Sequence, residues 1–246
     1  MSGKIGVLFL HGYTGGRYEL EPLFRYLKSR YDFEYEFPVY PGHGHHLDFN
    51  SVTGDDWYEE AHEAYEALSR KVDKVYIVGF SMGGLFASHI AQYDQVDKLL
   101  LIAPAFEYTH INRLSRLNLR PEGLGEHFKL KTMDVVRSRL TKLSLQAFNE
   151  FRGIVDAKMP DYGKIEAETL IVHGKIDLLV PYMSSVEAQK KMKNCRLELV
   201  EDAPHIMSYT EEHQHTLNII AERFLFPERK EFLSNCVNGV SIEKLY

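Results

Sequence analysis

The chain has 246 residues, of which 44% are hydrophobic and 26% are charged, and its formal net charge is −6. These proportions are typical of a folded globular protein and exclude fibrous and intrinsically disordered classes. The negative net charge gives no electrostatic reason to bind nucleic acid or an anionic membrane surface.

Two further features concern the compartment of the protein. Only two cysteines occur, Cys195 and Cys236, so the sequence predicts neither a disulfide framework nor a cysteine-rich zinc site. No apolar run reaches the length of a membrane span, and the first one, residues 5–10, is short for a signal peptide. We therefore expect a cytoplasmic protein without integral membrane association.

Short apolar runs alternate along the chain with stretches of helical periodicity. The predicted strands are residues 5–10, 33–39, 75–78, 98–102, 169–173 and 196–200. The predicted helices are residues 18–29, 55–70, 83–93, 181–193 and 211–226. Several of the runs are apolar throughout, as expected of parallel strands that are covered on both faces. The alternation predicts a doubly wound α/β fold with a mainly parallel, six-stranded sheet.

One interval between predicted strands is too long for a simple strand–helix–strand connection. About sixty residues separate the fourth predicted strand from the fifth, whereas a parallel crossover needs only about a dozen. The interval holds a basic segment, residues 112–120, and a helical pattern over residues 133–155. We interpret residues 107–165 as a cap or lid over the carboxyl edge of the sheet. The alternative is a pair of extra helices packed on one side of the sheet.

This interpretation divides the chain into two parts. Residues 1–106 and 166–246 would form the α/β core, and residues 107–165 the cap. The tail, residues 227–246, is only partly regular and has no assigned role.

The strongest chemical signal is the pattern Gly-x-Ser-x-Gly at residues 79–83, which directly follows a predicted strand and precedes a predicted helix. A nucleophilic serine in this position sits on a sharp, strained turn that projects its hydroxyl above the sheet. Gly79 and Gly83 would leave room for the close approach of neighbouring backbone. Ser81 is therefore the candidate nucleophile. The alternative is a glycine-rich turn with an idle serine.

A nucleophilic serine needs a histidine base and an acid that orients it. Asp177 follows the fifth predicted strand, and His205 lies in the loop after the sixth. With Ser81 they would share the carboxyl edge of a parallel sheet, where ligands bind in open α/β folds. The chain order serine, aspartate, histidine is the one such folds use.

Other residues compete for the roles of base and acid. His173 stands at a strand end and is the alternative base, although it could simply satisfy a backbone group there. The alternative acids are Asp156, Asp161, Glu201 and Asp202.

Acyl transfer also needs backbone N–H donors for the oxyanion. We expect one from Met82, the residue after the serine, and one from Tyr13 in the glycine-rich loop after the first strand. A plain strand–helix turn is the alternative for that loop. Its pattern of glycines matches neither phosphate-binding motif.

Three histidines, His43, His45 and His46, fall within four positions. They could bind zinc, but no carboxylate or cysteine nearby completes a ligand set. We interpret this segment as a tight loop after the second strand and predict no metal.

These segments together resemble the α/β-hydrolase superfamily, and within it the small bacterial carboxylesterases and monoacylglycerol lipases. The matching segments are residues 10–15 (LHGYTG), 40–44 (YPGHG), 79–84 (GFSMGG), 173–177 (HGKID) and 204–205 (PH). The resemblance covers roughly residues 4–226. It implies Ser81 as nucleophile, Asp177 as acid and His205 as base, oxyanion amides from Tyr13 and Met82, and a small cap.

The sequence also departs from the family pattern. The first two strands of the full fold are absent, as in the small esterases. Tyr13 stands where phenylalanine is common, which changes the side chain but not the backbone donor. The tail after Phe226 has no counterpart.

The expected function is that of a serine carboxylesterase that hydrolyses short- to medium-chain esters or monoacylglycerols through an acyl-enzyme, without a cofactor. Its partner would be a small-molecule ester. Phenylalanines of the insertion would line an acyl-binding pocket or form the insertion's own core; they are Phe106, Phe128, Phe148 and Phe151. The alternatives are a carbon–carbon bond hydrolase, a thioesterase, a peptidase, or a non-catalytic binding domain. The sequence leaves acyl-chain preference and oligomeric state open.

Overall fold

Six strands in the described part of the chain form one parallel sheet. The structure is a computed structural model and describes residues 3–107 and 144–227. The strands are β1 (Ile5–Leu10), β2 (Glu34–Glu36), β3 (Lys74–Phe80), β4 (Lys98–Ile102), β5 (Glu168–Gly174) and β6 (Cys195–Val200). Their order across the sheet is β2-β1-β3-β4-β5-β6, and every neighbouring pair is parallel. The predicted fold class is confirmed.

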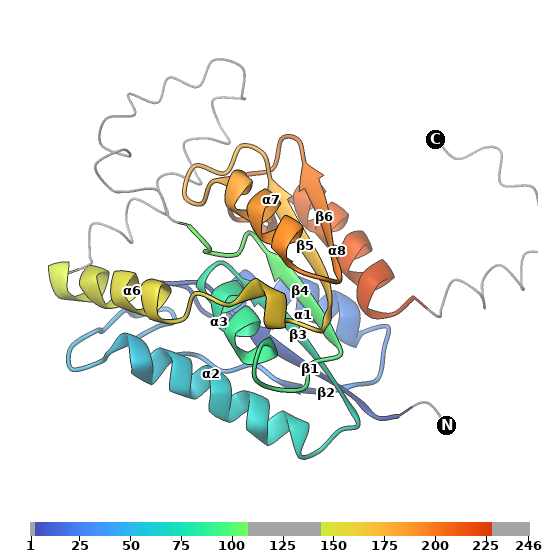
Figure 1. Ribbon diagram of the computed structural model, residues 1–246, viewed down its shortest axis with the longest axis horizontal. Coiled ribbons are helices and arrows are strands. Elements are labelled where there is room, and N and C mark those ends of the chain that lie inside the picture. The colour runs from blue at the N-terminus through green and yellow to red at the C-terminus, as the bar shows by residue number, and fades with distance from the viewer. Residues whose placement is uncertain (1–2, 108–143, 228–246) are drawn as a thin grey trace, which may run out of the picture.

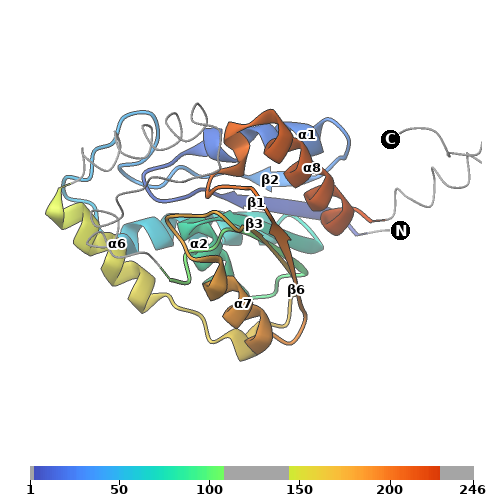
Figure 2. The same ribbon diagram turned by 90° about the horizontal axis from the view of Figure 1, so that it is seen from above.

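Helices cover both faces of this sheet. They are α1 (Glu21–Lys28), α2 (Gly54–Ser69), α3 (Met82–Ala91), α6 (Leu145–Ala157), α7 (Tyr182–Lys191) and α8 (Glu211–Leu225). Short 3-10 turns cover Arg17–Glu19, Tyr162–Lys164 and Met207–Tyr209. Figure 2 shows α1 and α8 together on one face, with α2 and α7 on the other. In the described part of the chain, no helix is both long enough and apolar enough to cross a membrane.

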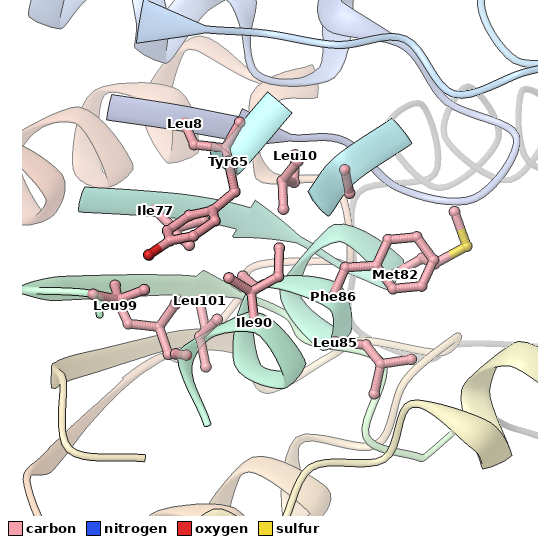
Figure 3. Close-up of a cluster of buried hydrophobic side chains, with 14 of the residues drawn as sticks. Leu8, Leu10, Tyr65, Ile77, Met82, Leu85, Phe86, Ile90, Leu99 and Leu101 are labelled. Atoms are coloured by element: carbon pink, nitrogen blue, oxygen red, sulfur yellow. The ribbon is translucent and has the colours of Figure 1, made fainter. Parts of the chain in front are cut away.

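The two faces of the sheet explain why β1 is apolar along its whole length. Leu8 and Leu10 belong to the core cluster under α2 and α3, whereas Val7 and Phe9 belong to the cluster under α1 and α8. Successive side chains of a strand point to opposite faces, so both sets of positions must be apolar when helices cover both sides. Figure 3 shows side chains of the first cluster between the strands and α3.

Two elements differ from expectation. The strand predicted over residues 33–39 pairs with β1 only over Glu34–Glu36. It lies at the edge of the sheet, and Pro38 has no N–H to extend a ladder of hydrogen bonds. The helix predicted over residues 18–29 begins instead at Glu21, after a 3-10 turn, with Pro22 in its first turn.

The long interval between β4 and β5 contributes α6. Ser144 caps α6 by accepting a hydrogen bond from the Ala147 N–H at 3.1 Å. The Glu150 carboxylate accepts a hydrogen bond from the Gly54 N–H at 3.1 Å, and α6 lies beside α2 (Figure 1). The basic segment 112–120, Phe128 and residues 133–143 of the expected helical pattern lie outside the described residues. The assignment of residues 107–165 as a cap therefore stays a prediction.

Candidate active site

Ser81 occupies a sharp turn between β3 and α3. Its backbone has φ 53° and ψ −116°, a positive φ that a residue with a side chain rarely adopts. Surrounding main chain holds this conformation: the Ser81 N–H donates to the Ile102 carbonyl at 2.9 Å, and the Ser81 carbonyl accepts from the Ala105 N–H at 3.0 Å. Backbone strain that its surroundings impose in this way is common where a side chain must project toward a ligand.

The two glycines that flank Ser81 are required by space. A Cβ atom on Gly83 would collide with the main-chain carbonyl of Leu10 at the end of β1. A Cβ atom on Gly79 would collide with the carbonyl of Gly83. The sequence predicted this crowding, and the structure shows it.

A chain of two hydrogen bonds starts at the Ser81 hydroxyl. Ser81 Oγ lies 3.0 Å from His205 Nε2, and His205 Nδ1 lies 2.6 Å from Asp177 Oδ2. An ionised carboxylate can only accept hydrogen bonds, so Nδ1 of His205 carries the proton. Nε2 is then free to accept the proton of the serine hydroxyl. The predicted nucleophile, base and acid are thus brought together in the required order.

Asp177 is held as an anion in a buried site. Its Oδ1 accepts hydrogen bonds from the N–H groups of Leu179 and Val180 at 2.8 and 2.9 Å. Burial alone would raise the pKa of this carboxyl group. The charge of His205 and the hydrogen bonds from His173 and His205 outweigh burial and hold the Asp177 pKa well below its ordinary value of 3.8.

The competing residues have other partners. Asp202 Oδ1 lies 3.3 Å from Nε2 of His213, and Glu201 pairs with Lys175. Asp161 accepts from the Gly163 N–H at 3.2 Å, and Asp156 is exposed on α6. His173, the alternative base, contacts Asp177. In the described part of the chain, the histidine that shares a hydrogen bond with the Ser81 hydroxyl is His205.

The loop after β1 is fixed by two residues whose contacts the sequence did not reveal. Nε2 of His11 accepts the Tyr40 N–H at 3.2 Å, so its other nitrogen, Nδ1, donates to the Gly12 carbonyl at 2.8 Å. Burial lowers the pKa of His11 to about 3, so the ring stays neutral. Glu19 accepts the Gly12 N–H at 2.9 Å. The sequence did hold one signal for a role of His11, because this polar residue directly follows an apolar strand.

The two backbone donors predicted for the oxyanion lie at the start of α3 and in the loop after β1. Met82 is the first residue of α3, where an N–H has no acceptor within the helix. Tyr13 follows Gly12 in a turn that is closed by the Gly15 N–H and the Gly12 carbonyl at 3.1 Å, so its own N–H is not used there. Their role at an oxyanion stays a prediction.

The side chain of Tyr13 reaches the inserted helix. Its ring stacks on Phe151, with centroids 4.4 Å apart and planes at 11°, and its hydroxyl donates to the Ala147 carbonyl at 2.8 Å. The loop after β1 and α6 are therefore in direct contact.

The histidines of residues 43–46 differ in their surroundings. His43 is buried next to Tyr40, Phe49 and Trp57, and burial lowers its pKa to about 4. His45 is exposed, with its ring 5.2 Å from that of Tyr18. Within residues 3–107 and 144–227, no three histidine, cysteine, aspartate or glutamate side chains are grouped to hold a metal ion.

Comparison with known families agrees with this arrangement. A family model described as the alpha/beta hydrolase family matches residues 7–218. The chain belongs to the alpha/beta hydrolase family. A thermostable monoacylglycerol lipase from Bacillus sp. (strain H-257) is 33% identical over 94 residues, which is 37% of each chain. A carboxylesterase from Bacillus subtilis (strain 168) is 36% identical over 87 residues, or 35% of each chain. The aligned segments thus span just over a third of these relatives.

A solved structure extends the comparison over nearly the whole chain. It is reported for LipS and LipT, two metagenome-derived lipolytic enzymes, and has a TM-score of 0.69 at 20% identity. It covers 93% of this chain and 95% of the other. Because only 20% of the aligned residues are identical, this likeness shows a shared fold and does not extend to function.

Proposed function

We propose that this alpha/beta hydrolase family member hydrolyses carboxylic esters with Ser81 as nucleophile. The observation that carries the proposal is the chain of hydrogen bonds from Ser81 through His205 to Asp177, which starts on a strained turn at the N-terminus of α3. A serine hydroxyl becomes an effective nucleophile when a neighbouring base accepts its proton.

The proposed reaction has two steps. Ser81 Oγ attacks the ester carbonyl carbon while His205 Nε2 takes the hydroxyl proton. The tetrahedral intermediate collapses, His205 returns that proton to the leaving alcohol, and an acyl-enzyme remains on Ser81. A water molecule then attacks the acyl carbon, with His205 again as base, and the carboxylic acid and free Ser81 are released.

Two further groups would stabilise the charges that develop. Asp177 would orient the His205 ring and stabilise its charged form. The N–H groups of Tyr13 and Met82 would donate to the oxyanion, and the loss of one such donor typically slows turnover by about 100-fold to 1,000-fold. The positive end of the α3 dipole would also stabilise the negative charge of the oxyanion.

The proposed substrates are short- to medium-chain esters and monoacylglycerols. Support comes from the two bacterial relatives, one a monoacylglycerol lipase and the other a carboxylesterase, each aligned over part of its length. Every step of the scheme uses side chains and amides of this chain and water, so it needs no metal or organic cofactor.

A chain-length series of p-nitrophenyl esters tests the proposal, with wild type and Ser81→Ala measured side by side. We expect activity to peak at short or medium acyl chains and to disappear in the variant, whose fold should be intact by circular dichroism. Monoacylglycerols would be the next substrates. Retention of more than a few per cent of activity in Ser81→Ala would contradict the assignment.

Inactivity of wild type on every ester would also contradict it. Thioesters, peptides and substrates with a cleavable carbon–carbon bond would then be tried. Labelling of Ser81 by an organophosphonate would separate an enzyme with another substrate from a non-catalytic binding domain.

A further inference from the structure

His173 is a buried histidine that the scheme above does not use. It lies near the carboxyl end of β5, and its side chain is fully buried. Its Nε2 lies 3.0 Å from Asp177 Oδ2 and 3.1 Å from the Val180 carbonyl oxygen. Its Nδ1 lies 2.7 Å from the hydroxyl oxygen of Ser185 in α7. Both ring nitrogens are thus occupied.

These partners determine where the proton of His173 lies. The Asp177 carboxylate and the Val180 carbonyl can only accept hydrogen bonds, so Nε2 must carry a proton and donate it. In the neutral ring Nδ1 is then an acceptor, and the Ser185 hydroxyl donates to it. The tautomer of His173 is therefore set by its surroundings.

As a result, the Asp177 carboxylate is held from four directions. Oδ1 accepts two main-chain N–H groups, from Leu179 and Val180. Oδ2 accepts two imidazole N–H groups, from His173 at 3.0 Å and His205 at 2.6 Å. A carboxylate with both oxygens occupied in this way cannot rotate without losing a charge-assisted hydrogen bond in a buried site.

We infer that His173 is a positioning residue: its Nε2–H holds Asp177 Oδ2 in line with His205 and takes up part of the carboxylate charge. This inference rests on the proposed function of Ser81. His173 does not touch Ser81 in the described hydrogen bonds, so it would act on the reaction only through Asp177 and His205.

Removal of the His173 donor should change the proton affinity of the Asp177–His205 pair in a predictable direction. The buried Asp177 anion would be stabilised less, so the Asp177–His205 pair would bind its proton more tightly. The acidic limb of the pH–rate profile would move to higher pH. The other titratable pairs on the adjoining loops are Lys175 with Glu201, which reaches solvent, and Asp202 with His213, and both stay the same in all variants.

Two amide variants provide a matched test. The Gln side-chain amide in His173→Gln reaches close to the position of Nε2 and can donate to Asp177. The shorter amide in His173→Asn reaches only the position of Nδ1, near Ser185. Both variants place an uncharged polar group in the same buried site, so a difference between them isolates the contact with Asp177.

The first readout is ester turnover as a function of pH. In His173→Asn we expect kcat to fall by about 10-fold to 100-fold with little change in KM, and the acidic midpoint to rise by about one pH unit. His173→Gln should keep kcat within about fivefold of wild type. Ser185→Ala should leave the acidic midpoint in place, because two acceptors still hold the proton on Nε2.

The second readout needs no substrate and separates this inference from the proposed function. In protein with ¹⁵N-labelled histidine, the NMR signal of the His205 Nδ1–H is followed against pH. Its titration midpoint should rise in His173→Asn and return toward wild type in His173→Gln. Inactivity of wild type on esters would overturn the esterase proposal and leave this result unaffected. Equal midpoints in wild type, His173→Asn and His173→Gln would overturn the role of His173.

Discussion

The hydroxyl of Tyr13 donates a 2.8 Å hydrogen bond to the main-chain carbonyl oxygen of Ala147, in the first turns of α6. The two residues are 134 positions apart in the sequence. Tyr13 is also the residue whose N–H is the proposed second donor to the oxyanion. The inserted helix and the loop that would stabilise negative charge are therefore connected through one side chain.

The variant Tyr13→Phe tests the importance of this connection. It keeps the ring that stacks on Phe151 and the backbone N–H, and it removes only the hydrogen bond to Ala147. We expect kcat for p-nitrophenyl esters to fall by about fivefold, which corresponds to about 1 kcal/mol for one hydrogen bond. Amide hydrogen exchange in α6 should become faster.

Tyr65→Phe is the matched control for Tyr13→Phe. The Tyr65 hydroxyl also donates to a main-chain carbonyl, that of Gln95, at 2.9 Å, but Tyr65 lies in α2 and neither it nor Gln95 belongs to the Ser81–His205–Asp177 chain or to the loop after β1. Tyr65→Phe should lower the stability by about as much as Tyr13→Phe does, and it should leave kcat unchanged. An equal loss of kcat in both variants would contradict a specific role of the Tyr13–Ala147 contact.

The crowding around Gly83 predicts a strong effect of one added methyl group. In Gly83→Ala the new Cβ would collide with the Leu10 carbonyl, so β1 and the serine turn must move apart. We expect a loss of stability of about 3 kcal/mol and a loss of ester turnover. Urea unfolding and kcat at a fixed pH measure the two effects.

Gly153→Ala provides the control for that substitution. Gly153 lies within α6, and a Cβ atom there would meet no atom within 4 Å. Because alanine favours a helix over glycine, this variant should gain up to about 1 kcal/mol of stability. Similar behaviour of the two alanine variants would show that the close approach at Gly83 is not required.

The two buried histidines near the loop after β1 predict sensitivity to acid. Burial lowers the pKa of His11 from 6.5 to about 3 and that of His43 from 6.5 to about 4. Below about pH 6.5 the unfolded chain binds protons that the folded chain does not. Stability should therefore fall as the pH is lowered from about 6.5 toward 4, by about 1.4 kcal/mol per pH unit for each histidine.

Urea unfolding of wild type and His43→Phe between pH 7.5 and 4.5 measures this slope. The variant keeps an aromatic ring but cannot be protonated, so its slope should be smaller by about 1.4 kcal/mol per pH unit. His46→Phe, at an exposed position of the same loop, is the control. If His43→Phe had the wild-type slope, His43 would not contribute to acid sensitivity.

The choice of acid can be tested with two isosteric variants. Asp177→Asn should lower kcat by about 10,000-fold, because an amide in that position no longer fixes the useful tautomer of His205. Asp202→Asn should retain wild-type kcat, because Asp202 contacts His213 rather than His205. The reverse ranking of the two variants would move the acid to Asp202.

The sequence predicted those parts of the molecule that depend on local pattern. The apolar runs of β1 and β3 predicted strands covered on both faces, and the ends of β3, β5 and β6 placed Ser81, Asp177 and His205 on one edge. Strand ends in a parallel sheet share an edge, so the juxtaposition followed from topology alone.

Contacts that depend on three-dimensional proximity were not predictable in the same way. The hydrogen bond from the Tyr40 N–H to His11 spans 29 positions, and that from Tyr13 to Ala147 spans 134. The role of His173 was ambiguous because a strand end limits the position of a residue but not the partners of its ring. The strand expected over residues 33–39 was too long: four of its seven residues are apolar or aromatic, but Pro38 at the sheet edge stops the pairing with β1.

The formation of an acyl-enzyme on Ser81 is the central claim, and mass spectrometry tests it most directly. Wild type and Ser81→Ala are mixed with p-nitrophenyl acetate, quenched in acid within the first turnovers, and digested. The account predicts a gain of one acetyl group on the wild-type peptide that contains Ser81 and no gain on that peptide in Ser81→Ala. Release of p-nitrophenol without acetylation of that peptide, or with acetylation of another residue in both proteins, would contradict it.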